Sequence, residues 1–294
     1  MTEINNKSQF GLNAGNLKMI ALFCMTLDHF AVAILDSLMM KGQGGRSIIT
    51  VVLYLILRLI GRVAFPIYCF FIAEGYERTH NKLKYLLRLF LLAVISEVPF
   101  DMVLFHKFFS MGACNVFWTL SLGLVTIWIT DSYERIKDKK VLVFIVRLII
   151  SMGAFLLADA FETDYSSVGI LTILLMFWVK KGEKWLSAAL TVLAFLSGML
   201  VNGIDLGSEG YIEIAIGLFC VCLIAFTAGK KFAPICGAIA LLLSDLTEIT
   251  GFFAVPLIAM YNGQKGRMNK WLFYFYYPGH LLILVLLCIL LGLY

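Results

Sequence analysis

The fold class is decided by the stretch LKMIALFCMTLDHFAVAILDSLMM, residues 17–40. An apolar run of this length can cross a bilayer as one helix, which needs about 20 residues. Within the run lie Lys18, Asp28 and His29, ionisable side chains that are expensive at membrane depth and mark functional positions. The stretch therefore predicts a first membrane span that carries functional groups.

The whole chain has the composition of a membrane protein. Its 294 residues are 61% hydrophobic and 15% charged, with a mean hydropathy of +0.90, whereas a soluble domain carries about 25% charged residues. We predict a polar N-terminus over 1–16, with no cleaved signal, and a single transmembrane domain over 17–294. The expected fold is an all-α, polytopic helical bundle of about 10–11 transmembrane helices in the lipid bilayer.

Apolar runs separated by charged loops predict the positions of the spans. The run 47–77 is longer than one span and contains Gly61 and Pro66, so we expect a tilted or broken helix there. The stretch 231–261 is either one long tilted helix or two short helices that meet at Ser244–Glu248. The other spans are expected near 17–40, 83–106, 114–132, 140–160, 166–180, 185–202, 210–228 and 272–294.

Positive charges recur in alternate loops. Lys and Arg gather near 78–84, 135–140, 180–184, 230–231 and 265–270, and acidic residues gather near 159–164 and 205–209. The positive-inside rule places the basic loops and the N-terminus in the cytoplasm, so we expect a multi-pass protein of the cytoplasmic membrane. The alternation continues through 265–270 only if 231–261 crosses twice, which favours eleven crossings. The net charge of +5 then reflects topology, and we expect no nucleic-acid partner.

The sequence lacks the motifs of several large enzyme classes. It contains no P-loop, GxGxxG, HExxH or GxSxG. The seven cysteines lie in or beside apolar runs and form no CxxC pair, so we interpret them as buried small hydrophobes and expect no metal. They are Cys24, Cys69, Cys114, Cys220, Cys222, Cys236 and Cys288.

Lys18 and His29 lie eleven residues apart in the first span. On a helix they share one face and stand about 16 Å apart, a distance comparable to the pantetheine arm of coenzyme A. Lys18 would hold a phosphate while His29, as a neutral imidazole, would act as general base or transient acyl carrier. Asp28 points elsewhere on the helix. The alternative is that Lys18 snorkels and that Asp28 and His29 are structural polar groups.

The second span carries Arg58 and Arg62 on one helix face. Two arginines at membrane depth need an anion, such as a pyrophosphate or a carboxylate. The alternative is that they pair with intramembrane acids such as Glu97 or Asp101. Farther along, Glu74 and Arg78 are also four residues apart, and a structural helix pair near the cytoplasmic end is the preferred interpretation.

Two carboxylates, Glu97 and Asp101, flank a proline in the third span. Burial would suit them to general acid or base work, or to a proton or cation pathway. Asn115 and Thr119 share a face at the start of the next span.

A second histidine, His280, follows Tyr277 near the start of the last span. A lone histidine at such a place is usually interfacial and structural, and the functional alternative is contact with a substrate.

Several strings resemble the TraX family. They are LKMIALFCMTLDHF (17–30), RLIGRVAFPIYCFFIAEGYERTHNKLKYLLRL (58–89), ISEVPFD (95–101), NVFWTLSLG (115–123), YNGQKGR (261–267) and FYYPGHLLIL (275–284). The resemblance covers nearly the whole chain and is most specific in its N-terminal third. It implies a membrane N-acetyltransferase of conjugative pilin, grouped with acyltransferases that share a helical membrane fold, a cytoplasmic acyl-CoA donor and an essential histidine in an early helix. His29 is the corresponding histidine, and Lys18 stands where the O-acetyltransferases carry an arginine.

The leading hypothesis is therefore an acetyl-CoA-dependent (acyl-CoA-dependent) N- or O-acyltransferase. The acceptor would be an amine or hydroxyl of a peptide such as pilin, of a glycan or of a lipid-linked molecule. We assign the predicted site residues in three groups, which are catalytic His29, Asp28, Glu97 and Asp101; donor-binding Lys18, Arg58, Arg62 and Arg78; and substrate-binding Glu74, Asn115, Thr119, Tyr277 and His280.

Two other classes of function stay open. A secondary transporter would use Glu97, Asp101 and Asp245 as coupling sites, although the inverted repeats of many transporters are not recognisable here. A non-catalytic assembly protein would tolerate His29→Ala, but it explains the charged residues of the spans poorly.

Overall fold

A computed structural model of the chain describes residues 11–41, 47–110, 112–133, 139–202, 208–227, 229–267 and 269–293. Within these ranges the chain is helical, and β structure is limited to two isolated bridges, Leu12 with Tyr261 and Cys114 with Thr163. The predicted all-α class is confirmed.

The N-terminal half forms the first four predicted spans. One continuous helical segment contains α1, a π-helical stretch and α2, and it begins three residues before the predicted start of the transmembrane domain. The elements are α1 (Ala14–Phe30), η1 (Ala31–Asp36), α2 (Ser37–Met40), α3 (Ile48–Gly61), α4 (Ala64–Arg78), α5 (Lys82–Phe105) and α6 (Val116–Ser132).

The second half supplies the remaining helices. Their bounds agree with the predicted spans to within a few residues. The elements are α7 (Lys140–Ala160), α8 (Ser166–Trp178), α9 (Lys184–Asn202), α10 (Ser208–Ala225), α11 (Ala233–Leu241), η3 (Leu246–Phe253), α12 (Ala254–Ala259) and α13 (Lys270–Leu290).

Length and hydropathy make this a multi-pass membrane protein. Five helices among the described residues are long and apolar enough to cross a bilayer. They cover Ala14–Met40, Ile48–Arg78, Lys140–Ala160, Lys184–Val201 and Trp271–Leu290. Shorter apolar helices pack between them, at Val116–Ser132, Ser166–Trp178, Ile214–Ala225 and Thr247–Ala259.

Short polar side chains cap the N-termini of several of these helices. The Oδ1 atom of Asn13 accepts from the Asn16 amide at the start of α1, and Asn81 caps α5 in the same way by accepting from Lys84. Asn115 caps α6 at the Phe117 amide. Such caps satisfy backbone donors that have no partner inside the helix, so they fix where each span begins.

The predicted break in the second span lies between α3 and α4. The Val63 amide bonds to the Ile60 carbonyl instead of continuing the α-helical pattern, and Pro66 has no amide hydrogen to return to Arg62. Gly61 lies at this break because a Cβ atom there would stand 2.4 Å from the Asp28 side chain. The break therefore lets α3 approach α1 closely at Asp28.

The stretch 231–261 consists of two short elements, α11 and the η3–α12 segment, which pack against each other. The turn between them lies at residues 242–245, where Asp245 caps η3 through the Thr247 amide. Both ends of the stretch reach one end of the bundle, since Gly229 bonds to Val179 and Tyr261 pairs with Leu12. The geometry is that of a re-entrant hairpin.

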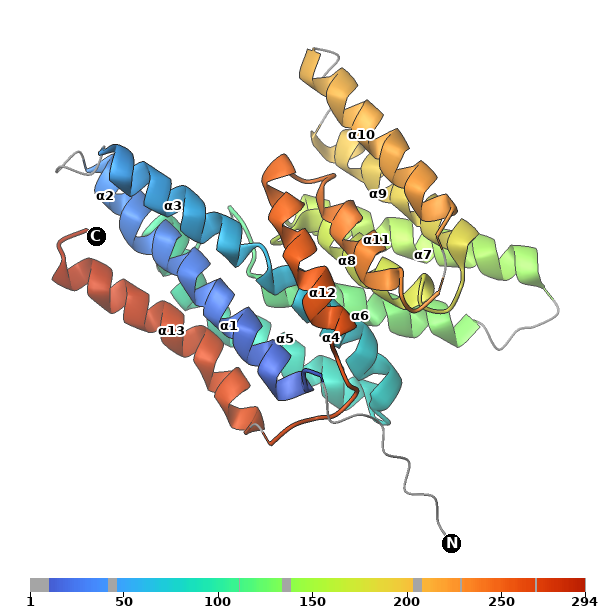
Figure 1. Cartoon of the computed structure of the whole chain (residues 1–294), viewed down its shortest axis with the longest axis horizontal. Helices are drawn as coiled ribbons and strands as arrows, with labels where there is room; N and C mark the ends of the chain where they lie inside the picture. The colour runs from blue at the N-terminus through green and yellow to red at the C-terminus, as the bar shows by residue number, and fades with distance from the viewer. Residues whose placement is uncertain are drawn as a thin grey trace, which may run out of the picture.

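The short helix α8 forms the centre of the bundle. It packs against α4, α6, α7, α9 and α11, and its residues from Gly169 to Trp178 are all buried. In Figure 1, α9 and α10 extend away from this centre, while α13 runs beside the α1–α2 segment. The first and last spans are therefore neighbours, although the whole chain separates them.

The described basic loops gather at one end of the molecule. Arg78 bonds to the Gly263 carbonyl, and Lys180 forms an ion pair with Glu74. Of the loop charges behind the orientation prediction, Arg135, Lys137 and Asp205 lie outside the described residues, as does the side chain of Glu209. We call the end that carries Arg78 and Lys180 the basic end.

Candidate functional site

His29 lies in the last turn of α1, immediately before the π-helical stretch. Its Nδ1 atom is 2.7 Å from the Nε2 atom of His280 on α13, and the edge of the Tyr277 ring contacts it at 5.9 Å between centroids. A π-helical turn widens a helix locally and is frequent at functional sites. The structure thus brings together three predicted site residues from the first and last spans.

One cavity, larger than a second that lies beside His29, begins at the basic end. It has a volume of about 230 Å³ and is enclosed by α1, α4, α5, α6 and α13, mostly by apolar and aromatic side chains. Its two cations are Lys18 and Lys265. The Lys18 Nζ atom lies 4.9 Å from the Phe71 ring centroid and 5.2 Å from that of Phe273. No carboxylate among the described residues pairs with Lys18, so an anion entering this cavity would meet an uncompensated positive charge.

A loop from the far end of the sequence forms the mouth of this cavity. Residues 261–267 lie on the N-terminus of α1, where the Asn262 amide donates to the Leu12 carbonyl and the Ala14 amide donates to the Gln264 carbonyl. Gly266 has a φ of +74°, and a Cβ atom there would meet Asn13 at 2.4 Å. This fit brings Lys265 to the same cavity as Lys18.

The smaller cavity, of about 40 Å³, lies beside His29. Asp28, Asp164 and Tyr165 also line it. Four side chains line both cavities, so the two spaces are neighbours and share part of their walls. The shared side chains are Met25, Tyr68, Val116 and Tyr277.

Two polar atoms at the smaller cavity have no hydrogen-bond partner among the described residues. They are Oδ1 of Asp28 and the hydroxyl of Tyr277, and both are buried. A buried polar group without a partner costs about 1–3 kcal/mol. A bound molecule that hydrogen-bonds to these atoms would remove that cost.

The predicted arginines are already paired. Arg58 binds Asp28 through Nη1 and Oδ2 at 2.7 Å, and the Nε atom of Arg62 lies 3.1 Å from Oε1 of Glu248 in η3. Arg62 also donates to the Tyr165 hydroxyl at 3.3 Å. The acids are therefore Asp28 and Glu248, not the Glu97 and Asp101 that the sequence suggested, because the helix break and the re-entrant hairpin bring them within reach.

Asp164 completes this charged group from the loop between α7 and α8. Burial raises the pKa of its carboxyl to about 6, against the opposing effect of Arg62. Thr119 fixes the loop, because its hydroxyl donates to the Asp164 carbonyl. Thr119 thus supports the wall of the smaller cavity.

Glu97 and Asp101 lie away from both cavities and organise the connection from α5 to α6. Glu97 accepts hydrogen bonds from the side chains of Asn115 and Trp118, and Asp101 accepts from the Ser110 amide at 2.7 Å. Asn115 also donates to the Ala93 carbonyl. In this structure the two acids and Asn115 hold a loop, and none of them contacts His29.

Glu74 and Arg78 lie at the basic end, where they bind each other at 2.6 Å. Arg78 also holds the 261–267 loop through Gly263, at 2.9 Å. They do not line either cavity.

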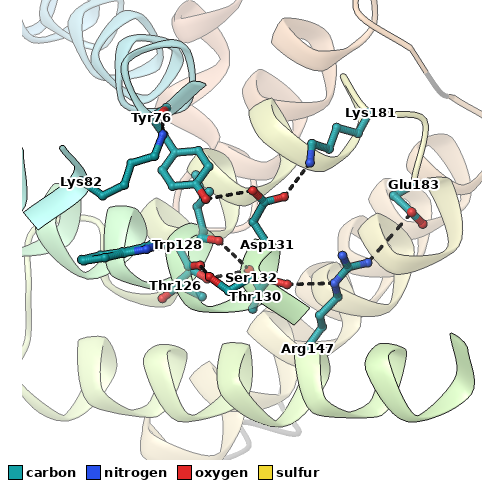
Figure 2. Close-up of polar contacts among 11 residues, drawn as sticks. Tyr76, Lys82, Thr126, Trp128, Thr130, Asp131, Ser132, Arg147, Lys181 and Glu183 are labelled. Carbon is teal, nitrogen blue, oxygen red and sulfur yellow. Dashed lines mark hydrogen bonds and ion pairs between the residues drawn. The ribbon is translucent and has the colours of Figure 1, made fainter. Parts of the chain in front are cut away.

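Next to this pair, Tyr76 and Lys181 both bind Asp131, as Figure 2 shows. Figure 2 also shows Arg147 donating to the Thr130 carbonyl. The network joins the ends of α4, α6 and α8 at the basic end.

Sequence reasoning missed four residues of this site: Asp164, Tyr165, Glu248 and Lys265. In the sequence, Lys265 of YNGQKGR has the character of a loop charge, and Glu248 that of a residue in the hairpin turn. Asp164 has the character of an outer-loop acid, and Tyr165 offers no signal because a single tyrosine in a loop is common.

Comparison with known proteins identifies relatives of the chain. A probable fimbrial assembly protein, FimC of serogroup H1 from Dichelobacter nodosus, is 32% identical over 139 residues, which is 45% of this chain and 52% of that protein. The chain thus spans about half the length of this curated relative. No solved structure matches the chain. The model of the TraX protein family matches residues 14–288, from the start of α1 almost to the end of α13, and the chain therefore belongs to the TraX family.

Proposed function

We propose that the chain is a membrane acyltransferase that moves an acetyl or other acyl group from acyl-CoA to a nucleophile. The observation that carries the proposal is the position of His29. It lies beside a small cavity that contains charged side chains, and that cavity shares four lining side chains with a larger one that begins at two lysines. A donor entering from the basic end and an acceptor in the smaller cavity would meet at this histidine.

Donor binding is assigned to the larger cavity. Lys18 and Lys265 would hold phosphates at its mouth, and the apolar walls would enclose the pantetheine arm. The rise of α1 separates Lys18 from His29 by about 16 Å, so a thioester on such an arm would reach the histidine. Arg78 would contribute by holding the 261–267 loop. Arg58 binds Asp28 and Arg62 binds Tyr165, and both partners line the smaller cavity, so we place the arginines beside the acceptor.

The reaction needs a general base and a hydrogen-bond donor to the developing oxyanion. His29 would take the proton of the acceptor amine or hydroxyl as the lone pair of the acceptor attacks the thioester carbonyl. The buried Tyr277 hydroxyl, which has no partner among the described residues, would donate to the oxyanion. Collapse of the tetrahedral intermediate would break the carbon–sulfur bond, and the histidinium would return its proton to the departing thiolate. Asp28 would contact the acceptor through its free Oδ1 atom.

The relative's name supports a peptide acceptor. A fimbrial assembly protein acts where fimbrial subunits are handled, and the TraX resemblance implies pilin modification. We therefore favour a pilin-like peptide over a glycan or a lipid-linked sugar. By the positive-inside rule the basic end and the N-terminus would face the cytoplasm, where acyl-CoA is available.

The proposal is tested by measuring the binding of the acyl donor. Acetyl-CoA would be titrated calorimetrically into the detergent-purified protein and its variants. Lys18→Ala and Lys265→Ala should each weaken binding at least about fivefold, since a charge-assisted contact contributes more than 1 kcal/mol. His29→Ala should bind normally. Lys231→Ala is the matched control, because it removes an exposed lysine at the same end.

Two results would overturn the proposal. One is the failure of the folded wild type to bind acetyl-CoA and longer acyl-CoAs. The other is equal weakening by Lys231→Ala, which would show only a general charge effect.

A further inference from the structure

A chain of hydrogen bonds runs from His29 to an atom that can only accept. The Nδ1 atom of His280 lies 2.9 Å from the backbone carbonyl oxygen of Tyr276. A carbonyl has no hydrogen to donate, so the proton of this bond must be on Nδ1 of His280. In the neutral imidazole the other nitrogen, Nε2, then carries a lone pair.

The same logic fixes the protonation of His29. Its Nδ1 atom lies 2.7 Å from Nε2 of His280, and because Nε2 is the acceptor, Nδ1 of His29 must be the donor. The Nε2 atom of a neutral His29 is then unprotonated, and no described residue binds it. This is the state that a general base requires.

The surroundings of His280 keep its ring in place. The ring stacks on Tyr276 at 5.3 Å between centroids, and Tyr277 contacts it edge-on at 5.4 Å. The Tyr276 hydroxyl lies 2.6 Å from the hydroxyl of Thr26, which donates to the Leu22 carbonyl. His280 itself is only 7% exposed, so water has little access to compete for its nitrogens.

We propose that His280 is a positioning residue that holds His29 in the Nδ1-protonated tautomer and so selects Nε2 as the atom that takes the acceptor's proton. The proposal rests on the acyltransferase function proposed above. His280 occupies the place that a carboxylate takes in the Ser-His-Asp arrangement, where it orients the histidine. Asp28 does not take that role in this structure, since Oδ2 binds Arg58, Oδ1 has no hydrogen-bond partner among the described residues, and Nδ1 of His29 is next to His280 instead.

The first test reads the tautomer directly and needs no substrate. Histidine would be labelled with ¹⁵N, and the ring nitrogens observed by solid-state NMR in lipid, because protonated and unprotonated ring nitrogens have well separated shifts. The chain has four histidines, so His29→Gln and His280→Gln spectra assign the signals. We expect His29 with Nδ1 protonated and Nε2 bare.

Substitutions separate the hydrogen bond from packing. His280→Leu removes the acceptor, and His29 should become a mixture of tautomers. His280→Gln offers an oxygen near the original Nε2 position and should keep Nδ1 of His29 protonated. Leu284→Ala is the packing control, because it deletes buried volume one turn along α13 and leaves both imidazoles in place, and it should lower stability but leave the spectrum unchanged.

Turnover gives the second readout, as release of CoA thiol from acetyl-CoA with a short peptide bearing a free amino terminus. His280→Leu should lower kcat by about 10²- to 10⁴-fold with little change in KM for acetyl-CoA, and His280→Gln should recover most of it.

Either of two results would overturn the proposal: a His29 that is protonated on Nε2 in the wild type, or a His280→Leu protein with an unchanged tautomer. The failure of wild-type protein to bind acetyl-CoA would instead contradict the proposed function, while the NMR result would still decide the tautomer.

Discussion

The ion pair between Arg62 and Glu248 should be one of the strongest single links between the re-entrant hairpin and the rest of the bundle. The two side chains are 17% and 4% exposed, and Nε lies 3.1 Å from Oε1. Surface pairs contribute about 0–1 kcal/mol, but removing one partner of a buried pair leaves an uncompensated charge and costs about 3–5 kcal/mol. We therefore expect Arg62→Met and Glu248→Leu each to lower the free energy of unfolding by about 3 kcal/mol or more.

The two substitutions should not be equal. In Glu248→Leu, Arg62 keeps the Tyr165 hydroxyl at 3.3 Å. In Arg62→Met, Glu248 loses its cation, and its Oε2 atom already has no partner among the described residues. Arg62→Met should therefore cost more, whereas the double variant should recover most of the loss, because an apolar pair of similar volume is often neutral or better.

The assay is reversible unfolding in mixed detergent and SDS micelles, followed by tryptophan fluorescence, for the wild type, both single variants and the double variant. A second link, the hydrogen bond from the Thr250 hydroxyl to the Leu59 carbonyl at 2.8 Å, is left intact in all four proteins. Single losses below about 1 kcal/mol that simply add in the double variant would refute the reasoning. They would mean that water or lipid headgroups solvate the pair.

Three more predictions concern the surroundings of His29 and the α5–α6 connection. Gly61→Ala should cost about 1–3 kcal/mol, since its Cβ would stand 2.4 Å from Asp28 in a packed interface; a Tm equal to that of the wild type would contradict this. Asp164 has an ordinary pKa of 3.8 that burial raises to about 6 in the folded protein, so the folded state binds more protons between these values and stability should fall as pH rises from about 4 to 6. Asp164→Asn should remove that part of the slope in Tm measured from pH 4 to 7, and an unchanged slope would exclude Asp164 as its source. Glu97→Gln should loosen the α5–α6 connection, because its carboxylate accepts from Trp118 at 2.9 Å; faster hydrogen exchange over 106–115 would show this, and unchanged exchange would argue against the role.

Hydropathy alone was sufficient to locate the spans. Apolar run length is set by bilayer thickness, so each predicted span has a helical counterpart, and the break near Gly61 and Pro66 followed from backbone chemistry. The first residue of each helix is harder to predict, because N-terminal caps such as Asn13 and Asn81 depend on local side-chain geometry. For 231–261 the sequence allows one long helix or two short ones, and the packing of α11 against the η3–α12 segment distinguishes the two forms.

The site was only partly predictable, because hydropathy does not say which helix faces which. His29 and His280 were each noticed, but nothing in the sequence joins residues that lie 251 positions apart. Arg58 and Arg62 were understood to need anions, yet their partners come from α1 and η3. In the sequence Lys265 resembles an ordinary charge of a cytoplasmic loop, and only the packing of the 261–267 loop on α1 brings it to the cavity.

The contact between the first and last spans also determines when the site can exist during synthesis. Lys18 and His29 enter the membrane first, but Lys265 and His280 arrive with the final segments of the chain. A nascent protein that has inserted everything through α11 lacks the 261–267 loop that forms the cavity mouth, and it lacks the partner of His29. Assembly of the proposed donor site and of the histidine pair is thus the last step of biogenesis, and a prematurely released chain would be inserted but would lack both.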